Sequence, residues 1–263
     1  MNVAFVRALE AAVARRQPVA AITILDGPHL GVKLLVDETG VIIAGGNSGD
    51  AARDAQLADA AAESLRARRT EEKRLAVGDA DARVMIESYP PPPSLVVIGA
   101  AHIAVPLTRF AQEMGFDVAL IDAREWFLTA ERFPHVARRI LAWPDKGMAE
   151  LVLDAETYLV ILSHDPKFER PALKYALQFP LRYIGAIGSR KTHADRLATL
   201  RAEGVSDADL ARIHAPIGLN IGAVSPEEIA ISILAEMIAA REGKAGGMMS
   251  AARKPTEATA RPA

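Results

Sequence analysis

The sequence predicts an α/β protein in which a small N-terminal α/β domain precedes a Rossmann-like domain with a parallel sheet. Two observations support this prediction. After residue 94, apolar runs alternate with segments of helical periodicity, which is the pattern of repeated strand–helix–strand units. Before that, the run YPPPPS at residues 89–94 cannot continue a helix or a sheet ladder, so it divides the chain into two parts.

Hydrophobic periodicity locates the individual elements. Before the prolines it predicts a helix from Val3, strands at 18–25 and 32–46 (the latter folded at 38–40), and a helix at 48–69. After the prolines it predicts strands at 94–99, 117–122, 157–163 and 181–188, with helices ending near 114 and lying near 171–178 and 189–203. The predicted organisation is a domain at 1–88, a linker at 89–94, a Rossmann-like domain at 95–242 and a flexible tail at 243–263.

Composition excludes several classes of function. The chain has 263 residues, is 50% hydrophobic and carries a net charge of −2, so it can bury a sizeable core and has no basic field for nucleic acid or anionic lipid. It has no cysteine, which excludes disulfides, thiolate metal sites and a cysteine nucleophile. The six histidines form no metal-binding pair. Residues 1–17 lack a signal-peptide pattern and no run spans a bilayer, so we expect a soluble, cytoplasmic protein.

The first strand of the second domain runs into a turn typical of dinucleotide binding. In LVVIGAAHIAVPL, the segment Gly99-Ala100-Ala101-His102-Ile103-Ala104 occupies the place of a G-x-G-x-x-G/A fingerprint. Ala101 replaces the second glycine, so its methyl group can hold a phosphate off the backbone. Asp122 ends the next strand, 23 residues after Gly99, where a carboxylate can bind a ribose hydroxyl. His102 either faces the crevice or fills the turn.

Two further turns follow strands of the same predicted sheet. Ser163, His164 and Asp165 come after the third strand, at the end where open α/β sheets bind ligands. Adjacent residues of an extended chain point to opposite sides, so we predict no His–Asp dyad. A helix cap made by Ser163 or Asp165 is the alternative.

The run YIGAIGSRKT has the composition of an anion site. Gly185 and Gly188 precede Ser189, Arg190 and Lys191 at the start of a helix, whose free N–H groups and dipole attract negative charge. It is not a Walker loop, because the glycine spacing differs and no Gly-Lys-Ser/Thr follows. The alternative is that Ser189 caps the helix and both cations are solvated.

The last strong element is SPEEIAISILAEMIAAREG. Ser225 is a good N-cap, Pro226 suits the first helical position and Glu228 completes a capping box. The predicted apolar face of this helix is Ile229, Ile233, Leu234, Met237 and Ile238.

Taken in order, these motifs resemble the XdhC/CoxI family of accessory proteins for molybdenum hydroxylases such as xanthine and carbon monoxide dehydrogenases. The resemblance extends from about residue 95 to residue 241. It rests on five segments: VVIGAAHIAVPL, DVALIDAREWFLTAERFP, LSHDPKFERPAL, YIGAIGSRKTHADRLATLRAEGV and IHAPIGLNIGAVSPEEIAISILAEMIAAR.

The resemblance implies a non-catalytic carrier of the molybdenum cofactor, in its molybdopterin or dinucleotide form. Such a carrier supports sulfuration of the cofactor with a partner cysteine desulfurase and delivers it to an apo molybdenum hydroxylase, acting as a homodimer or bound to its partner. It implies that the anion at Gly188 is the cofactor's phosphate. The implied cofactor-binding residues are Gly99, Ala100, Ala101, His102, Asp122, Ser163, His164, Asp165, Gly185, Gly188, Ser189, Arg190 and Lys191.

Two other functions stay open at this point. The chain could be an NAD(P)-dependent oxidoreductase in which Asp122 binds the ribose and His102 or His164 donates a proton. It could also be a scaffold that binds an apoenzyme and no ligand.

Departures from the family pattern bear on this choice. The family's N-terminal GS-S/A-PR turn is missing, and AGGNSGD stands where SGGC is expected, with Asp50 at the cysteine position. Aspartate cannot act as a thiolate ligand or sulfur carrier. Ala101 replaces a glycine, and Asn220 stands where we expect aspartate.

Overall fold

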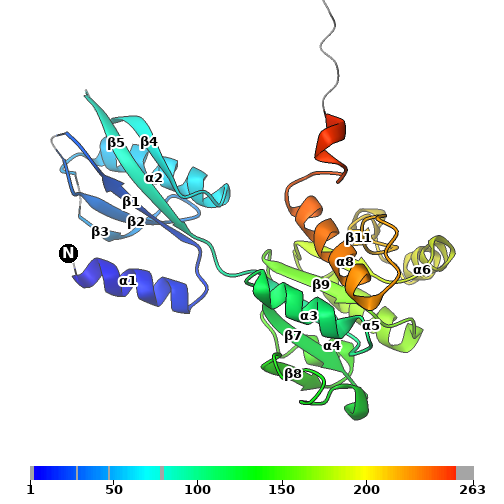
Figure 1. Ribbon diagram of the computed structural model, residues 1–263. Coiled ribbons are helices and arrows are strands. Elements are labelled where there is room, and N and C mark those ends of the chain that lie inside the picture. The colour runs from blue at the N-terminus through cyan, green and yellow to red at the C-terminus, as the bar shows by residue number, and fades with distance from the viewer. Residues whose placement is uncertain (1–2, 28, 47, 78–79, 253–263) are drawn as a thin grey trace, which may run out of the picture. The chain divides into compact units, whose positions relative to one another are not determined.

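The computed structural model describes residues 3–27, 29–46, 48–77 and 80–252, and the chain divides into two compact units, residues 1–92 and 93–263 (Figure 1). The division lies inside the segment predicted as a linker. Of the predicted tail, residues 253–263 lie outside the described residues, and the described part includes a short 3₁₀ turn, η2 (Met249–Ala252).

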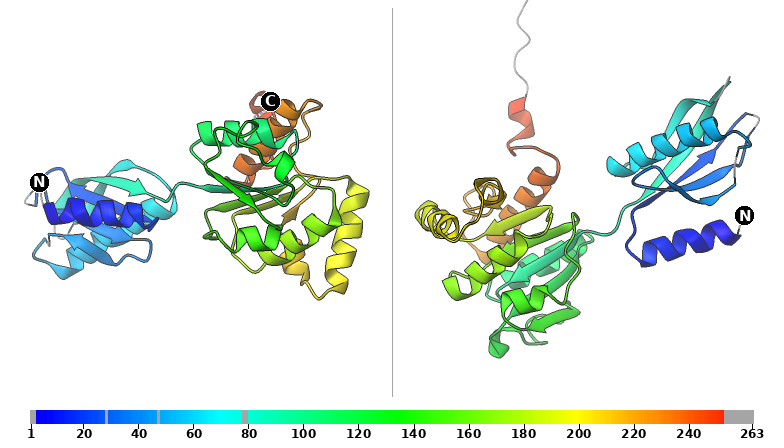
Figure 2. Two further views of the ribbon diagram at one scale, coloured as in Figure 1. Left: turned by 90° about the horizontal axis from the view of Figure 1, so that it is seen from below. Right: turned by 180° about the vertical axis from the view of Figure 1, so that it is seen from behind.

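The N-terminal unit is a five-stranded antiparallel sheet with a helix on each face (Figure 2). The strand order is β3-β2-β1-β5-β4. Its elements are α1 (Val3–Ala14), β1 (Val19–Ile24), β2 (Lys33–Asp37), β3 (Ile42–Gly45), α2 (Ala51–Arg66), β4 (Glu71–Val77) and β5 (Ala80–Tyr89).

The side chains of alternate residues of β1 point to opposite faces of this sheet. Ala20 and Ile22 pack in the cluster that α2 covers, whereas Val19 and Ala21 pack in the cluster that α1 covers. The predicted helices and the first three strands are confirmed. The β4–β5 hairpin was not predicted, because β4 begins with four charged residues; charge of this kind protects an edge strand from pairing with other chains.

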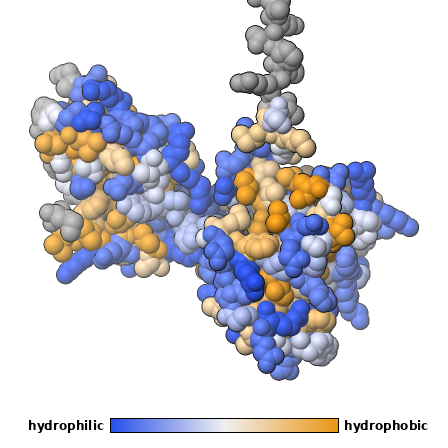
Figure 3. Space-filling view, in the orientation of Figure 1, coloured by the Kyte–Doolittle hydropathy of each residue, from blue (hydrophilic) through white to orange (hydrophobic). Residues whose placement is uncertain are grey.

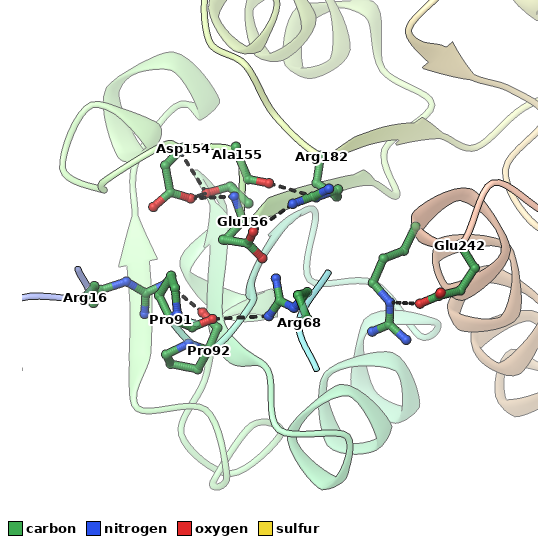
Figure 4. Close-up of polar contacts among 11 residues, drawn as sticks. Arg16, Arg68, Pro91, Pro92, Asp154, Ala155, Glu156, Arg182 and Glu242 are labelled. Carbon is green, nitrogen blue, oxygen red and sulfur yellow. Dashed lines mark hydrogen bonds and ion pairs between the residues drawn. The ribbon is translucent and has the colours of Figure 1, made fainter. Parts of the chain in front are cut away.

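The middle of the proline segment is held by two arginines of the N-terminal unit. Arg16 and Arg68 follow the ends of α1 and α2 with φ of 56° and 53°. The Arg16 guanidinium donates to the carbonyl of Pro92 at 2.7 Å, and that of Arg68 donates to the carbonyl of Pro91 at 3.4 Å (Figure 4). Proline carbonyls still accept hydrogen bonds although proline has no N–H to donate.

The C-terminal unit is built on six parallel strands in the order β11-β10-β9-β6-β7-β8. This is the doubly wound order of a Rossmann fold, so the predicted fold class is confirmed. The elements are β6 (Ser94–Ile98), α3 (Ala104–Glu113), β7 (Asp117–Asp122), η1 (Glu125–Phe127), β8 (Arg138–Leu141), α4 (Pro144–Met148), β9 (Thr157–Ile161), α5 (Pro166–Ala176), β10 (Tyr183–Ala186), α6 (Arg190–Ala202), α7 (Asp207–Leu210), β11 (Ile213–His214) and α8 (Pro226–Arg241).

Helices cover both faces of this sheet, which explains why its central strands are continuous apolar runs. Leu95 and Val97 of β6 pack in a cluster with α3 and α8, while Val96 and Ile98 pack in a second cluster with α4, α5, α6 and α7. At the amino ends of the strands, Arg182 donates to the Ala155 carbonyl at 2.9 Å and to Glu156 at 2.7 Å (Figure 4).

Helix α8 begins where its sequence signals predict. Ser225 accepts from the N–H of Glu228 at 3.2 Å, and Glu228 accepts from the N–H of Ser225 at 3.0 Å, which confirms the capping box. The predicted buried face is wrong at one position. Ile233, Leu234 and Met237 are buried, but Ile238 is 40% exposed, because it lies about 100° further round the helix than Met237.

An apolar surface therefore remains on the outer side of α8. Ile231 and Ile238 of the helix are exposed, as are Ile221 and Val224 of the preceding loop. Figure 3 shows apolar residues gathered over this part of the C-terminal unit. In the part of the chain that the structure describes, no helix is long and apolar enough to cross a membrane.

Candidate functional site

The predicted site residues lie at one edge of the parallel sheet. They lie in the last residues of β7 and β10 and in the turns after β6, β9 and β10. These four strands lie side by side in the order β10-β9-β6-β7, and all of them point their carboxyl ends to the same edge. The chain leaves β6 and β9 in opposite directions around the sheet, so the crevice between them is the switch point where open α/β sheets bind ligands.

The turn after β6 requires its glycine. Gly99 has a φ of +100°, and a Cβ there would lie 3.4 Å from the backbone of Leu162 and of Ser163 on the adjacent strand. Ala100 is fully buried, Ala101 is partly buried and His102 is exposed. The residue at the N-cap of α3 is Ile103, which offers no side-chain acceptor to the first N–H groups of the helix.

Asp122 binds the backbone of the turn after β6 through its buried side chain. Its side chain is fully buried, and its Oδ2 accepts from the N–H of Ala100 at 2.8 Å. The same carboxylate accepts three further bonds from Arg124: from the backbone N–H and Nε at Oδ1, and from Nη2 at Oδ2. Burial by itself raises the pKa of Asp122, but these hydrogen bonds outweigh burial and hold the pKa below its usual value.

Arg124 is a site residue that our residue assignments missed, although it lies within the DAREWF segment. Its guanidinium carbon lies 4.3 Å from the centre of the Phe127 ring and 5.2 Å from that of Phe168. Of the three guanidinium nitrogens of Arg124, Nε and Nη2 donate to Asp122, and Nη1 has no hydrogen-bond partner among the described residues. Arg124 thus presents a fixed positive group at the end of β7. Its closeness to Asp122 in the sequence is a signal for this role, whereas its contact with Phe168 appears only in the fold.

The turn after β9 is a helix cap. Ser163 is buried and its Oγ accepts from the N–H of Asp165 at 3.2 Å. Asp165 in turn accepts from the N–H of Lys167 at 2.9 Å and is the N-cap of α5. His164 is exposed beside them. The capping alternative is therefore what the structure shows for Ser163 and Asp165, and His164 and Asp165 form no dyad.

The two glycines of YIGAIGSRKT do different things. Gly185 is buried in β10, and a Cβ there would overlap the Ile217 side chain, so this glycine serves packing. Gly188 lies in the turn with a φ of +146°, a conformation that side chains rarely adopt.

The residues after Gly188 begin α6. Ser189 accepts from the N–H of Thr192 at 3.1 Å, which confirms it as N-cap. The N–H groups of Arg190 and Lys191 have no acceptor within the helix, and both side chains are exposed. The turn thus combines a helix N-terminus with two exposed cations.

A buried ion pair between α5 and α6 contacts the turn at Gly188. Arg196 of α6 donates to Glu169 of α5 at 2.5 and 2.8 Å, and only 3% of the Arg196 side chain is exposed. Arg196 Nη2 also donates to the carbonyl of Ile187 at 2.9 Å, directly before Gly188. A cavity of about 160 Å³ lies between α5 and α6, with His164, Thr192 and this ion pair among its lining residues.

A second polar network, at the β10–β11 side of the sheet, was also missed. The hydroxyl of Tyr183 donates to Glu236 of α8, which also accepts from the N–H of Gly218 at 2.8 Å. His214 stacks on Tyr183 with ring centres 4.6 Å apart. Burial and the Glu236 carboxylate raise the pKa of Tyr183 far above its usual value, so this tyrosine stays protonated and acts as a donor.

Asp50, which the resemblance sets at the position of a family cysteine, has a structural role in the N-terminal unit. Its Oδ1 accepts from the N–H of Ala52 at 2.8 Å and of Arg53 at 3.3 Å, which caps α2. These hydrogen bonds lower the pKa of Asp50, and the bond from the backbone of Arg53 has the larger effect. Among the described residues of both units, no group of three or more histidine, aspartate or glutamate side chains is arranged to hold a metal ion.

Several known proteins resemble this chain. The family model of the XdhC Rossmann domain matches residues 95–237, more than half of the chain. Over 157 residues the chain is 36% identical to the Escherichia coli (strain K12) protein YqeB, a match that covers 60% of this chain and 29% of that protein. Over 164 residues it is 30% identical to a probable xanthine dehydrogenase subunit of Bacillus subtilis (strain 168), covering 62% of this chain and 48% of that protein.

A third relative is the molybdenum cofactor insertion chaperone PaoD of Escherichia coli (strain K12), 36% identical over 93 residues, which are 35% of this chain and 29% of PaoD. The chain thus spans less than half the length of each of these three relatives. A crystal structure of a xanthine dehydrogenase from Bacillus halodurans superimposes with a TM-score of 0.66 at 22% identity, covering 90% of this chain and 63% of that one, and supports the fold. From the match over residues 95–237, the chain belongs to the XdhC family.

Proposed function

We propose that this chain is an accessory protein that binds the molybdenum cofactor as cargo and delivers it to an apo molybdenum hydroxylase. One observation carries the proposal: an XdhC-family Rossmann domain gathers a glycine turn, two helix N-termini and three cationic side chains at the carboxyl ends of β6, β7 and β10. The name of the Escherichia coli chaperone points to the same class of role, and the name of the Bacillus subtilis relative links that protein to xanthine dehydrogenase.

The proposed contact for the cofactor's phosphate is the turn at Gly188. An anion there would receive the N–H groups of Arg190 and Lys191, the positive end of the α6 dipole and two side-chain cations. Arg124 Nη1 offers a further donor at the end of β7. The remaining predicted contacts, at Gly99 to His102 and Ser163 to Asp165, border the same edge of the sheet.

The proposed partner in sulfuration is a cysteine desulfurase, and the route of the sulfur follows from composition. The chain has no cysteine, so it cannot carry a persulfide. Any sulfur that the bound cofactor acquires would therefore have to come from a cysteine of a partner, such as the desulfurase, and not from this chain. The exposed apolar surface at Ile221, Val224, Ile231 and Ile238 supports a protein partner, because such patches commonly mark interaction sites.

The oxidoreductase alternative predicts that Asp122 binds a ribose. Asp122 is fully buried and accepts four hydrogen bonds from its own chain, so a ribose hydroxyl would have to displace one of them. The Rossmann strand order and the Gly99 turn still justify a direct comparison of the two ligands.

The test is retention of the cofactor by the full chain. The protein is incubated anaerobically with freshly released molybdenum cofactor, separated by gel filtration and oxidised so that retained cofactor becomes a fluorescent pterin. We expect stoichiometric pterin in the protein peak. Absence of pterin, together with a change in nicotinamide fluorescence on adding millimolar NAD(P)H, would favour the oxidoreductase. Absence of both, with capture of an apo hydroxylase, would favour the scaffold.

Gly188→Asp is expected to weaken cofactor retention by about tenfold or more relative to Gly188→Asn, because it sets a negative charge against the proposed phosphate. The two variants have side chains of the same size and share the strain of the positive φ, so they differ chiefly in charge. The measurement is the pterin recovered across a series of protein concentrations, with circular dichroism as the check on folding. Equal retention by the two variants would show that the phosphate binds elsewhere.

A further inference from the structure

A groove of about 470 Å³ opens beside the turn after β6. It is formed by the start of α3, by η1 and the loop after it, and by the first turn of α8; α3 and α8 lie side by side on the same face of the sheet (Figure 1). The side chains that matter for recognition are His102, Trp126, Phe127, Arg132 and Glu227. Its volume lies within the range of small-molecule sites, about 300–1,000 Å³.

The aromatic wall of the groove consists of an exposed indole and a phenyl ring that packs against the core. Trp126 is 71% exposed, so its indole contributes little to the core. Phe127 next to it is half-buried and packs against the core cluster, with its ring centre 6.3 Å from that of Trp126 and the two ring planes inclined by 46°. An exposed indole beside an anchored phenyl ring offers an aromatic face on which a flat heteroaromatic ring can stack.

The polar side chains that line the groove include one cation and one anion. Arg132 Nη1 donates to the carbonyl of Phe127 at 2.7 Å, and its guanidinium lies 5.5 Å from the Phe127 ring, so the backbone and the wall hold it. Glu227 is exposed in the first turn of α8, whose start is set by the capping box of Ser225 and Glu228. The groove thus offers one guanidinium donor, one carboxylate acceptor and an aromatic face.

This set matches one class of ring. A 2-amino-4-oxo pyrimidine fused to a second ring has two adjacent N–H donors on one edge, which a carboxylate accepts together, and a 4-oxo acceptor beside them, which a guanidinium binds. The pterin of the molybdenum cofactor is such a ring, and guanine is the other common one. Cytosine and adenine lack this edge.

We infer that the groove between η1, α3 and α8 binds the pterin ring of the cofactor, with the ring on Trp126, its two-donor edge on Glu227 and its 4-oxo group on Arg132. The inference rests on the proposed function. His102 lies at the end of the groove nearest the turn after β6, so the substituent that leads to the phosphate would run past this histidine along the sheet edge.

The chain offers an internal reporter for this inference. It has two tryptophans, Trp126 and Trp143, so Trp143→Phe leaves the groove residue as the sole source of indole fluorescence. Full-length Trp143→Phe is titrated with neopterin, a pterin without phosphate or dithiolene, and in parallel with GMP and CMP. Free N-acetyltryptophanamide corrects for absorption by the ligands. We expect saturable quenching by neopterin, weakened about fivefold or more by Glu227→Gln and by Arg132→Leu.

Glu131→Gln is the matched control. It removes the same charge one residue away from Arg132, on an exposed side chain that does not line the groove, and should leave neopterin binding unchanged. Quenching by GMP but not neopterin, or by CMP alone, would overturn the pterin assignment. So would neopterin quenching that ignores Glu227→Gln and Arg132→Leu, and so would a lack of quenching by all three ligands.

Comparison with cofactor retention separates this inference from the proposed function. If the wild-type chain retains the cofactor and Trp126→Leu retains it equally well, the groove assignment fails and the carrier function stands. If neopterin binds in the groove but the cofactor is not retained, the carrier function fails on its own.

Discussion

Replacement of Arg196 by methionine is expected to lower the free energy of unfolding of the C-terminal unit by about 3–5 kcal/mol. The substitution leaves the Glu169 carboxylate buried without its guanidinium partner, and it removes the donor that Arg196 gives to the Ile187 carbonyl. Removal of one member of a buried pair costs far more than the net value of the pair, because the remaining charge is not resolvated.

The measurement is urea denaturation followed by tryptophan fluorescence, which reports on this unit because both tryptophans lie in it. Arg201→Met is the matched control on the same helix: its partner is Asp207, the two side chains are 56% and 79% exposed, and the expected loss is about 1 kcal/mol or less. Arg196→Lys should recover only part of the stability, since an ammonium cannot reproduce the two parallel bonds. A loss for Arg196→Met no larger than that for Arg201→Met would contradict this account.

The sequence predicts the strands and helix starts around the site because their signals are local. β6, β7 and β9 are apolar runs buried on both faces, and α6 and α8 begin at serines whose capping function depends on the next three residues. The short β8 and β11 carry no such signal. β8 is Arg-Arg-Ile-Leu with one buried residue, and β11 has two residues, so neighbouring strands determine both.

The chemistry of the site was less predictable because it depends on contacts between distant residues. Arg196 and Glu169 lie 27 positions apart, and no pattern joins them before the fold brings α5 and α6 together. Gly185 and Gly188 look alike in the sequence, yet they are glycines for different reasons. A side chain at the buried Gly185 would overlap the Ile217 side chain, whereas Gly188 has a φ that other residues rarely adopt. The spacing of Asp122 from Gly99 suggested a ribose ligand, whereas the donors that occupy its oxygens come from Ala100 and Arg124.

Asp122 also gives the second large prediction. Asp122→Asn is expected to lower the free energy of unfolding by about 3 kcal/mol or more at neutral pH. Each carboxylate oxygen accepts two hydrogen bonds. An amide nitrogen in the place of Oδ1 would face two donors of Arg124, and one in the place of Oδ2 would face one donor of Ala100 and one of Arg124. The buried site also loses the negative charge that balances the Arg124 guanidinium.

This loss should depend on pH in a defined direction. The folded-state pKa of Asp122 lies below its unfolded value, so the carboxylate stabilises the fold fully above about pH 5, and that stabilisation is lost as the pH falls through about 4 toward the folded pKa. Protonation removes the negative charge of Asp122 in the wild type, and the substitution to asparagine has already removed it in the variant. The difference in stability between wild type and Asp122→Asn should therefore shrink steadily from pH 6 to pH 3.

The difference between the two proteins is the informative quantity, because other carboxylates of the unit with lowered pKa, such as Glu203 and Glu228, titrate alike in both and cancel. The difference in the free energy of unfolding is measured by urea denaturation of both proteins at each pH, followed by tryptophan fluorescence. A difference that stays constant down to pH 3 would mean that the Asp122 carboxylate is not what holds the turn after β6. If the difference shrinks as expected, Asp122 acts by shaping the turn beside the crevice, and a ligand there must draw its hydrogen bonds from the backbone and from Arg124 rather than from this carboxylate.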